Sequence, residues 1–208
     1  MHRIVEAHLK SFVSSFSLEA DDEAKQFEKF AAYTVISNRF SGSFDLDDLV
    51  TGDGDEGIDG IAIVIDEGIT ASIEEAEGVF VTPRRNHDVD IVFIQAKRSE
   101  SFNLGEFLKF KEGVLRFATA SPYTATDEVL VEARSMFDVV LHQVPKLRKP
   151  RWCFGCGCHQ AARLSATQAK RKIMPPVEWG DFMPDIGPTH FCDELAANMQ
   201  MALAYIRF

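Results

Sequence analysis

The sequence of 208 residues lacks the features of a membrane protein, an exported protein or a repeat protein. No apolar run approaches the roughly 20 residues that cross a bilayer, so we expect no membrane partner. The amino terminus has no apolar core of a signal peptide, so a cytoplasmic location is expected. The sequence has no internal repeat and no low-complexity segment. Without an export signal we expect reduced thiols at the four cysteines, which are Cys153, Cys156, Cys158 and Cys192.

Basic residues are scarce: 22 Lys and Arg stand against 32 Asp and Glu, which gives a net charge of −10. Contacts with nucleic-acid phosphates need Lys and Arg, so this charge argues against a general nucleic-acid-binding surface. The charges are unevenly distributed, however, and a locally positive groove on an acidic protein is compatible with them. Acidic residues gather in 19–28, 45–59 and 66–77, and basic ones at 84–85, 97–98, 146–151 and 163–172.

The most informative stretch is 54–101, which contains two apolar runs, each next to a short motif with a charged residue. Gly-Ile-Asp-Gly at 57–60 leads directly into the apolar run 61–65, and a second run at 89–97 ends in Gln95-Ala96-Lys97. Both runs are rich in β-branched residues, which predicts two strands. Side chains alternate along a strand, so Gln95 and Lys97 project from the same face. Asp59 at the start of one strand can therefore converge with them on one point.

Gly-Ile-Asp-Gly, a strand, and a second strand ending in Gln-Ala-Lys resemble the PD-(D/E)xK nuclease superfamily. The nearest resemblance is to Mrr-type restriction endonucleases and to the amino-terminal region of abortive-infection phage-resistance (AIPR) proteins, which often carry Gln where other members carry Glu. It covers about residues 20–120 and implies an α/β restriction-endonuclease-like fold, with a mixed central sheet flanked by helices. The AIPR proteins are longer, so the chain is expected to be an amino-terminal part or a stand-alone version.

The resemblance implies a metal-dependent DNA endonuclease acting in defence against phage or foreign DNA, and it assigns roles to individual residues. Asp59, Glu28 and Gln95 would hold Mg²⁺ or Mn²⁺, and Lys97 would orient the water or stabilise developing negative charge. Glu28 is included because Phe27-Glu28 matches a Phe-Glu pair on the first core helix of the Mrr-like pattern, with Glu23 as the fallback. Gln in place of Glu removes one negative charge, so weaker metal affinity is expected.

Arginines near these motifs extend the hypothesis to DNA contacts, and cleavage of both strands by one site per chain favours a homodimer. The expected contacts are Arg84, Arg85 and Arg98. The alternative function is a catalytically inactive nucleic-acid-binding or assembly module of the same fold, which the acidic net charge favours.

Each site residue also has a simpler interpretation. Glu28 lies at the flank of a buried stripe and is equally typical of a solvated charge. Asp59 is typical of a turn aspartate that caps backbone amides. Gln95 and Lys97 fit a polar pair on a solvent-facing edge strand. The arginines of 66–88 fit a solvated loop.

The remaining patterns predict one domain, with a core at about 20–160 and a helical appendage at about 160–208. Helices are expected at 3–16, 22–38, 104–119, 126–143 and 190–207. We expect Asp21 or Asp22 to cap the second helix. In the helix 104–119 the residues expected to face inward are Leu104, Phe107, Leu108, Val114, Leu115 and Ala118. The segment 66–88 is interpreted as an extended hairpin or flexible arm, with an extra short strand at 78–82.

The cysteine-rich segment 151–159 has two interpretations. An aromatic-rich run after a helix is typical of a further core strand. Alternatively, Cys153, Cys156, Cys158 and His159 form a zinc site, joined by His190 and Cys192. No second Cys-x2-Cys pair exists, and the spacing matches no common zinc finger, so the strand is favoured.

Overall fold

The computed structural model describes residues 3–38, 40, 42–52, 57–83, 86–98, 104–147, 151–157 and 200–207. The helices are α1 (Arg3–Ser15), α2 (Glu23–Ser37), α3 (Ile73–Val81), α4 (Leu104–Thr119) and α5 (Glu128–His142), followed by the 3-10 turn η1 (Val144–Lys146). The strands are β1 (Gly60–Ile65), β2 (Gly68–Thr70), β3 (Val89–Lys97), β4 (Arg151–Gly157) and β5 (Gln200–Arg207). None of the helices in these ranges has both the length and the apolar character of a membrane span.

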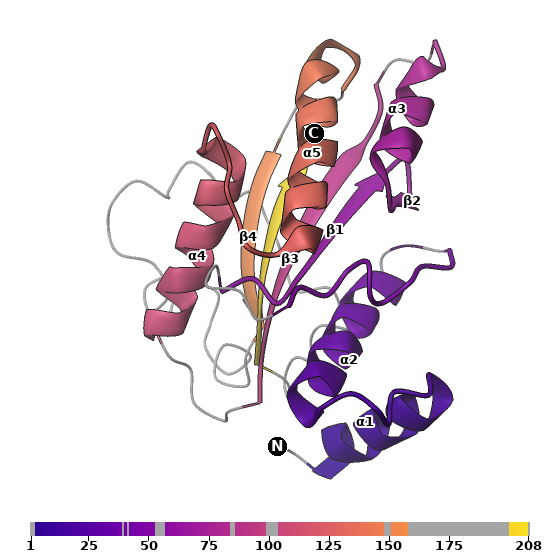
Figure 1. Ribbon diagram of the computed structural model, residues 1–208, viewed down its shortest axis with the longest axis vertical. Coiled ribbons are helices and arrows are strands. Elements are labelled where there is room, and N and C mark those ends of the chain that lie inside the picture. The colour runs from indigo at the N-terminus through magenta and orange to yellow at the C-terminus, as the bar shows by residue number, and fades with distance from the viewer. Residues whose placement is uncertain are drawn as a thin grey trace.

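The strands form one sheet in the order β2-β1-β3-β5-β4 (Figure 1). Every pairing in it is antiparallel, so the described strands do not form the expected mixed sheet. The register gives the reason for the central pair: Ile65, the last residue of β1, lies opposite Val89, the first of β3. The connection between them therefore leaves and re-enters the sheet at the same end, whereas a parallel pair needs a crossover to the other end.

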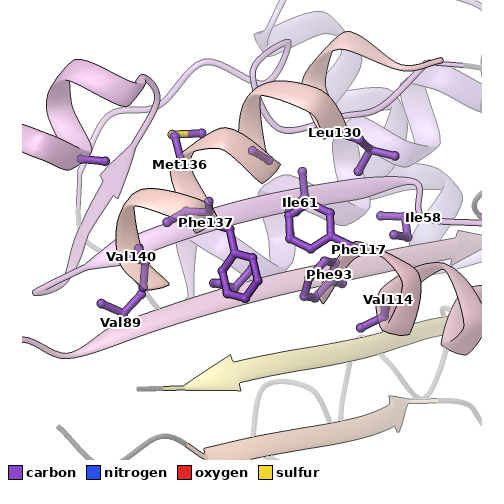
Figure 2. Close-up of a cluster of buried hydrophobic side chains, with 14 of the residues drawn as sticks. Ile58, Ile61, Val89, Phe93, Val114, Phe117, Leu130, Met136, Phe137 and Val140 are labelled. Atoms are coloured by element: carbon purple, nitrogen blue, oxygen red, sulfur yellow. The ribbon is translucent and has the colours of Figure 1, made fainter. Parts of the chain in front are cut away.

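Helices cover both faces of this sheet, which makes the protein an α/β structure of three layers (Figure 1). Helices α1 and α2 pack on the face that carries Val92 and Ile94 of β3. Helices α3, α4 and α5 pack on the opposite face, where Phe93 contacts Phe117 of α4 edge-on at 5.1 Å between ring centroids. Figure 2 shows this second cluster, with side chains from β1, β3, α4 and α5 meeting between the helices and the sheet.

Several predicted elements are confirmed. All six residues of β1 are buried, as expected for a strand with helices over both of its faces. Helix α2 buries the predicted stripe of Phe27, Phe30, Ala31 and Thr34. Asp22 caps this helix, because its Oδ1 accepts hydrogen bonds from the N–H groups of Ala24 and Lys25, both at 2.9 Å.

The segment 66–88 differs from the prediction. It contains the short strand β2 and the helix α3, and the strand expected at 78–82 is absent because 73–81 is helical. Ser72 caps α3 by accepting a hydrogen bond from the Glu75 N–H, and the Glu75 carboxylate accepts one from the Ala71 N–H at 2.9 Å. The Ser-x-x-Glu spacing at 72–75 is a helix-start signal that the sequence contains.

Helix α4 lies where it was expected, and its inward face is as predicted only in part: Val114 is buried, and Phe107 and Ala118 pack partly buried against the same cluster. The buried residues include Phe110, Val114 and Phe117, whereas Leu104 and Leu108 are about half exposed. The sequence carries two apolar stripes on this helix. The stripe with two aromatic rings buries more apolar area, and it is the one that packs on the sheet.

The carboxyl-terminal part also differs from the prediction. Residues 200–207 form β5, which pairs with both β3 and β4, rather than the end of a helix. Apolar residues fill most of this stretch, and a short apolar run fits a buried strand as well as a helix. The strand interpretation of 151–157 is confirmed by β4. Cys158, His159, His190 and Cys192 lie outside the described residues, as do residues 190–199 of the expected helix.

Candidate active site

Asp59 lies at the start of β1, directly beside the end of β3. Gly60 pairs with Ile94, and the Asp59 N–H donates to the Ile94 carbonyl at 2.8 Å, which continues the ladder one residue beyond β1. The Asp59 side chain turns toward β3, where its Oδ2 accepts a hydrogen bond from the Ala96 N–H at 2.7 Å. The carboxylate is therefore fixed to the strand that carries Gln95 and Lys97.

Gln95 is almost fully buried, with 3% of its surface exposed, and β3 lies inside the sheet between β1 and β5. The edge-strand interpretation of Gln95 and Lys97 is therefore wrong. The Gln95 Nε2 donates to the carbonyls of Gly57 at 3.0 Å and Glu106 at 3.3 Å. Two carbonyl acceptors identify this end of the amide as the nitrogen. The side chain thus ties the loop before β1 to the first turn of α4.

Lys97 forms an ion pair with Glu106, whose Oε2 lies 3.1 Å from the lysine Nζ. Burial alone would lower the pKa of the Lys97 ammonium. The negative charges of Asp59, Glu106 and Glu28 together raise it by more, so the pKa lies above its usual value. Lys97 is accordingly charged at neutral pH. Because 39% of its side chain is exposed, the ammonium remains accessible to a ligand.

Glu106 was not identified from the sequence. It lies in the first turn of α4, the helix that follows the Gln-x-Lys strand and packs on the same face of the sheet as Phe93. An acidic residue in the first turn of such a helix is a usable signal, because that turn approaches the end of the preceding strand. The apolar pattern of this helix predicted only a role in the core.

Glu28 reaches the site from the other layer, because α2 covers the opposite face of the sheet. A quarter of its side chain is exposed, and its Oε2 lies 3.7 Å from the Nζ of Lys25. The negative charge of Glu28 contributes to the raised pKa of Lys97, which places the two groups within electrostatic reach. Lys25, also not identified from the sequence, donates to the Thr51 carbonyl. Carboxylates from both helical layers therefore approach this end of the sheet.

Burial has the largest effect on Asp59 and raises the pKa of its carboxyl group. The Ala96 hydrogen bond and the positive charges of Lys97 and Lys25 lower this pKa, and Glu106 raises it. The net result is a pKa above the usual value, because partial loss of solvent outweighs the positive partners. An additional cation beside Asp59 would stabilise its charged form.

The donor set fits a hard cation. Asp59 and Glu28 supply carboxylate oxygens and Gln95 an amide oxygen, which are the ligand types that Mg²⁺ and Mn²⁺ prefer. In the part of the chain that the structure describes, no three His, Cys, Asp or Glu side chains are grouped tightly enough to hold an ion by themselves. Mg²⁺ is commonly held by one or two carboxylates together with waters and substrate phosphates, so two carboxylates are sufficient.

The predicted DNA contacts lie at the margin or outside the described structure. Arg98 is 44% exposed and forms an ion pair with Glu23 at 2.9 Å, which joins the end of β3 to the first turn of α2. The side chain of Glu23, the fallback ligand, is 80% exposed in this pair. Arg84 and Arg85 lie outside the described residues.

Comparisons of the chain with protein-family models, with curated proteins and with solved structures find no match.

Proposed function

We propose that the chain is a metal-dependent nuclease that hydrolyses phosphodiester bonds in DNA, in defence against phage or foreign DNA. The observation that carries the proposal is the meeting of Asp59, buried Gln95 and charged Lys97 at one end of two paired strands. Glu28 approaches the same end from α2. A bound Mg²⁺ or Mn²⁺ would supply Lewis acidity toward the scissile phosphate and activate water.

The protein groups have separate tasks in this mechanism. Asp59 and Glu28 provide negative charge for the cation, and the Ala96 hydrogen bond holds the Asp59 carboxylate in one orientation. The Gln95 hydrogen bonds fix the surrounding backbone, so the site is arranged before substrate binds. Lys97 presents its ammonium to the negative charge that develops on the phosphate oxygens. Glu106 keeps this ammonium in position.

The direct test is a cleavage assay on plasmid and single-stranded DNA with Mg²⁺ or Mn²⁺. We expect cleavage by the wild type, and loss of it in Asp59→Ala and Lys97→Ala. Lys10→Ala is the matched control, because Lys10 also forms an ion pair, with Glu6 at 2.9 Å, but lies on α1. Cleavage that survives both site substitutions would contradict the proposal.

A second candidate is a nucleic-acid-binding or assembly module without cleavage activity. One observation favours it: Lys25, Lys97 and Arg98 each form an ion pair with a carboxylate, which reduces the positive charge offered to DNA phosphates. Fluorescence anisotropy with labelled DNA separates the two functions. Binding that is independent of divalent cations and unaffected by Asp59→Ala, together with no cleavage, would support the module.

A further inference from the structure

Lys25 pairs with Glu28, one of the two carboxylates that the proposed function gives to the metal. It lies one helical turn before Glu28 on α2, and its Nζ is 3.7 Å from the Glu28 Oε2. The same Nζ donates to the Thr51 carbonyl, while the Thr51 N–H donates to the Asp59 carbonyl at 3.3 Å. Thr51 therefore holds the Lys25 ammonium on the Asp59 side of the helix.

The ammonium also acts on Asp59 electrostatically, since its charge favours the ionised form of that carboxyl group. Around this end of the sheet, Glu28, Asp59 and Glu106 supply three negative charges, whereas Lys25 and Lys97 supply two positive ones. The described side chains are thus nearly neutral together without any added ion. A divalent cation would turn the net charge of −1 into +1 as long as both lysines stay in place.

On the premise that the proposed function is correct, we infer that Lys25 is a built-in competitor of the metal ion. Its ammonium pairs with Glu28 until a divalent cation replaces it, which weakens metal binding and limits nuclease activity at low metal concentration. A like charge so close to the ion raises the free energy of the bound state. With 29% of its side chain exposed and a long flexible stem, Lys25 can turn to solvent when the ion binds.

Lys25 differs in this respect from Lys97. Lys97 is held by Glu106 from α4, on the other face of the sheet, and its ammonium stays available to substrate when a cation binds at Asp59 and Glu28. Lys25 shares Glu28 with the cation and cannot keep that partner. The inference therefore separates two lysines that lie at the same end of the sheet.

The test is a titration of the full chain with Mn²⁺, followed by electron paramagnetic resonance of the free ion, in the absence of DNA. We expect Lys25→Met and Lys25→Gln to bind Mn²⁺ about 10- to 100-fold more tightly than the wild type. Lys25→Gln removes the charge but keeps a donor for the Thr51 carbonyl, so it serves if Lys25→Met disturbs the fold. Lys25→Arg keeps the charge and is expected to bind as weakly as the wild type.

Two controls give every outcome a meaning. Lys10→Met removes an ion-paired lysine of α1 and is expected to leave Mn²⁺ affinity unchanged. Asp59→Asn is expected to abolish the tight binding gained in a Lys25→Gln background. Binding that depends on Asp59 but is the same in the wild type and both neutral Lys25 variants would overturn the role of Lys25 and leave the proposed function intact. Absence of Mn²⁺ binding in all variants would overturn both.

Discussion

The strand pair β1–β3 carries an aspartate at each end, and the two ends are built differently around it. In both cases a main-chain N–H at β3 fixes the carboxylate: Ala96 donates to Asp59 at 2.7 Å, and Asp88 donates to Asp66 at 3.0 Å. The local arrangement of strand, aspartate and backbone donor is therefore shared. The neighbours of each carboxylate decide what it can do.

At the Asp66 end the second carboxylate oxygen faces a rigid, buried ring. The His87 Nδ1 lies 2.7 Å from the Asp66 Oδ2, and only 1% of His87 is exposed. The ring packs edge-on against Phe80 at 5.1 Å between centroids. The main-chain N–H of His87 donates to the Lys146 carbonyl, and the Lys146 ammonium donates to the Phe80 carbonyl. These contacts join the end of β1 to α3 and η1.

At the Asp59 end the carboxylate faces long, charged side chains that reach solvent. Lys97 and Glu106 are both more than a third exposed, and Lys25 and Glu28 about a quarter. Such groups can exchange one partner for another, whereas the buried ring cannot. The comparison teaches that an aspartate at a strand end becomes a candidate site only when its remaining partners are exchangeable.

The largest effect is expected from exchanging each aspartate for asparagine. Asp59→Asn should lower DNA cleavage by about 1000-fold, because loss of one metal-binding charge removes several kcal/mol of stabilisation. Asp66→Asn should lower the melting temperature but leave the activity of the folded protein within about threefold. Paired cleavage assays and thermal melts measure both quantities. Equal loss of activity in the two variants would remove the functional difference between the two ends.

Gln95→Glu should be the most destabilising change at the Asp59 end. A carboxylate in place of the amide loses both hydrogen bonds and faces the carbonyls of Gly57 and Glu106 from a buried position. The expected loss is about 3 kcal/mol of unfolding free energy. Urea denaturation measures it, with Gln95→Met as the control that removes the donors without adding charge. A Gln95→Glu variant that keeps wild-type stability and binds metal more tightly would instead show that Gln95 weakens metal affinity only because it lacks the negative charge of Glu.

His87→Ala should lower the free energy of unfolding by about 2 kcal/mol through its effect on the Asp66 end. The substitution removes a buried ring from its contact with Phe80 and deprives the Asp66 carboxylate of a partner. Because the change lies at the far end of the strands from Asp59, the Mn²⁺ affinity of the folded protein should stay unchanged. Chemical denaturation and Mn²⁺ titration of the same samples check this. A loss of Mn²⁺ affinity would show that the two ends are coupled.

Gly57→Ala should have the smallest effect, about 1 kcal/mol of unfolding free energy. Gly57 has a φ of +68°, which costs an alanine about 1 kcal/mol. An added Cβ would also lie 3.2 Å from the backbone nitrogen of Phe110. Gly42→Ala is the matched control, because nothing lies within 4 Å of a Cβ at that position. Equal thermal melts for both variants would mean that the loop before β1 yields easily.

Local patterns in the sequence were sufficient for much of the fold. The β-branched content of 61–65 and 89–97 predicted β1 and β3, and hence the shared face of Gln95 and Lys97. Helix α3 was missed because 66–88 was interpreted as an extended hairpin or flexible arm, although Ser72 and Glu75 form a helix start. The inward face of α4 depends on which of two apolar stripes the sheet accepts, and the helix pattern alone does not contain that information.

The sequence indicated the strand residues of the candidate site and Glu28 of α2, but neither Lys25 nor Glu106. Asp59, Gln95 and Lys97 are related by strand register, which the motif order indicates. Lys25 and Glu106 lie on helices of opposite layers, and their approach to Asp59 depends on how both helices pack. The hydrogen bonds of Gln95 to two carbonyls likewise depend on tertiary structure. These hydrogen bonds give Gln95 a structural role that the sequence did not indicate, while its amide oxygen can still serve as a metal ligand.

The pairing of β3 with β5 has a consequence for the order of folding. Residues 89–97 pair with β1 across the connection 66–88, but their other neighbour is 200–207, more than a hundred residues later in the chain. Closing so long a loop is slow compared with forming local contacts. During synthesis the largely apolar β3 therefore has one unpaired edge until the carboxyl-terminal strand has left the ribosome. An open edge of this kind is a template for intermolecular strand pairing, so pairing with β5 ends a period in which the nascent chain is exposed to aggregation.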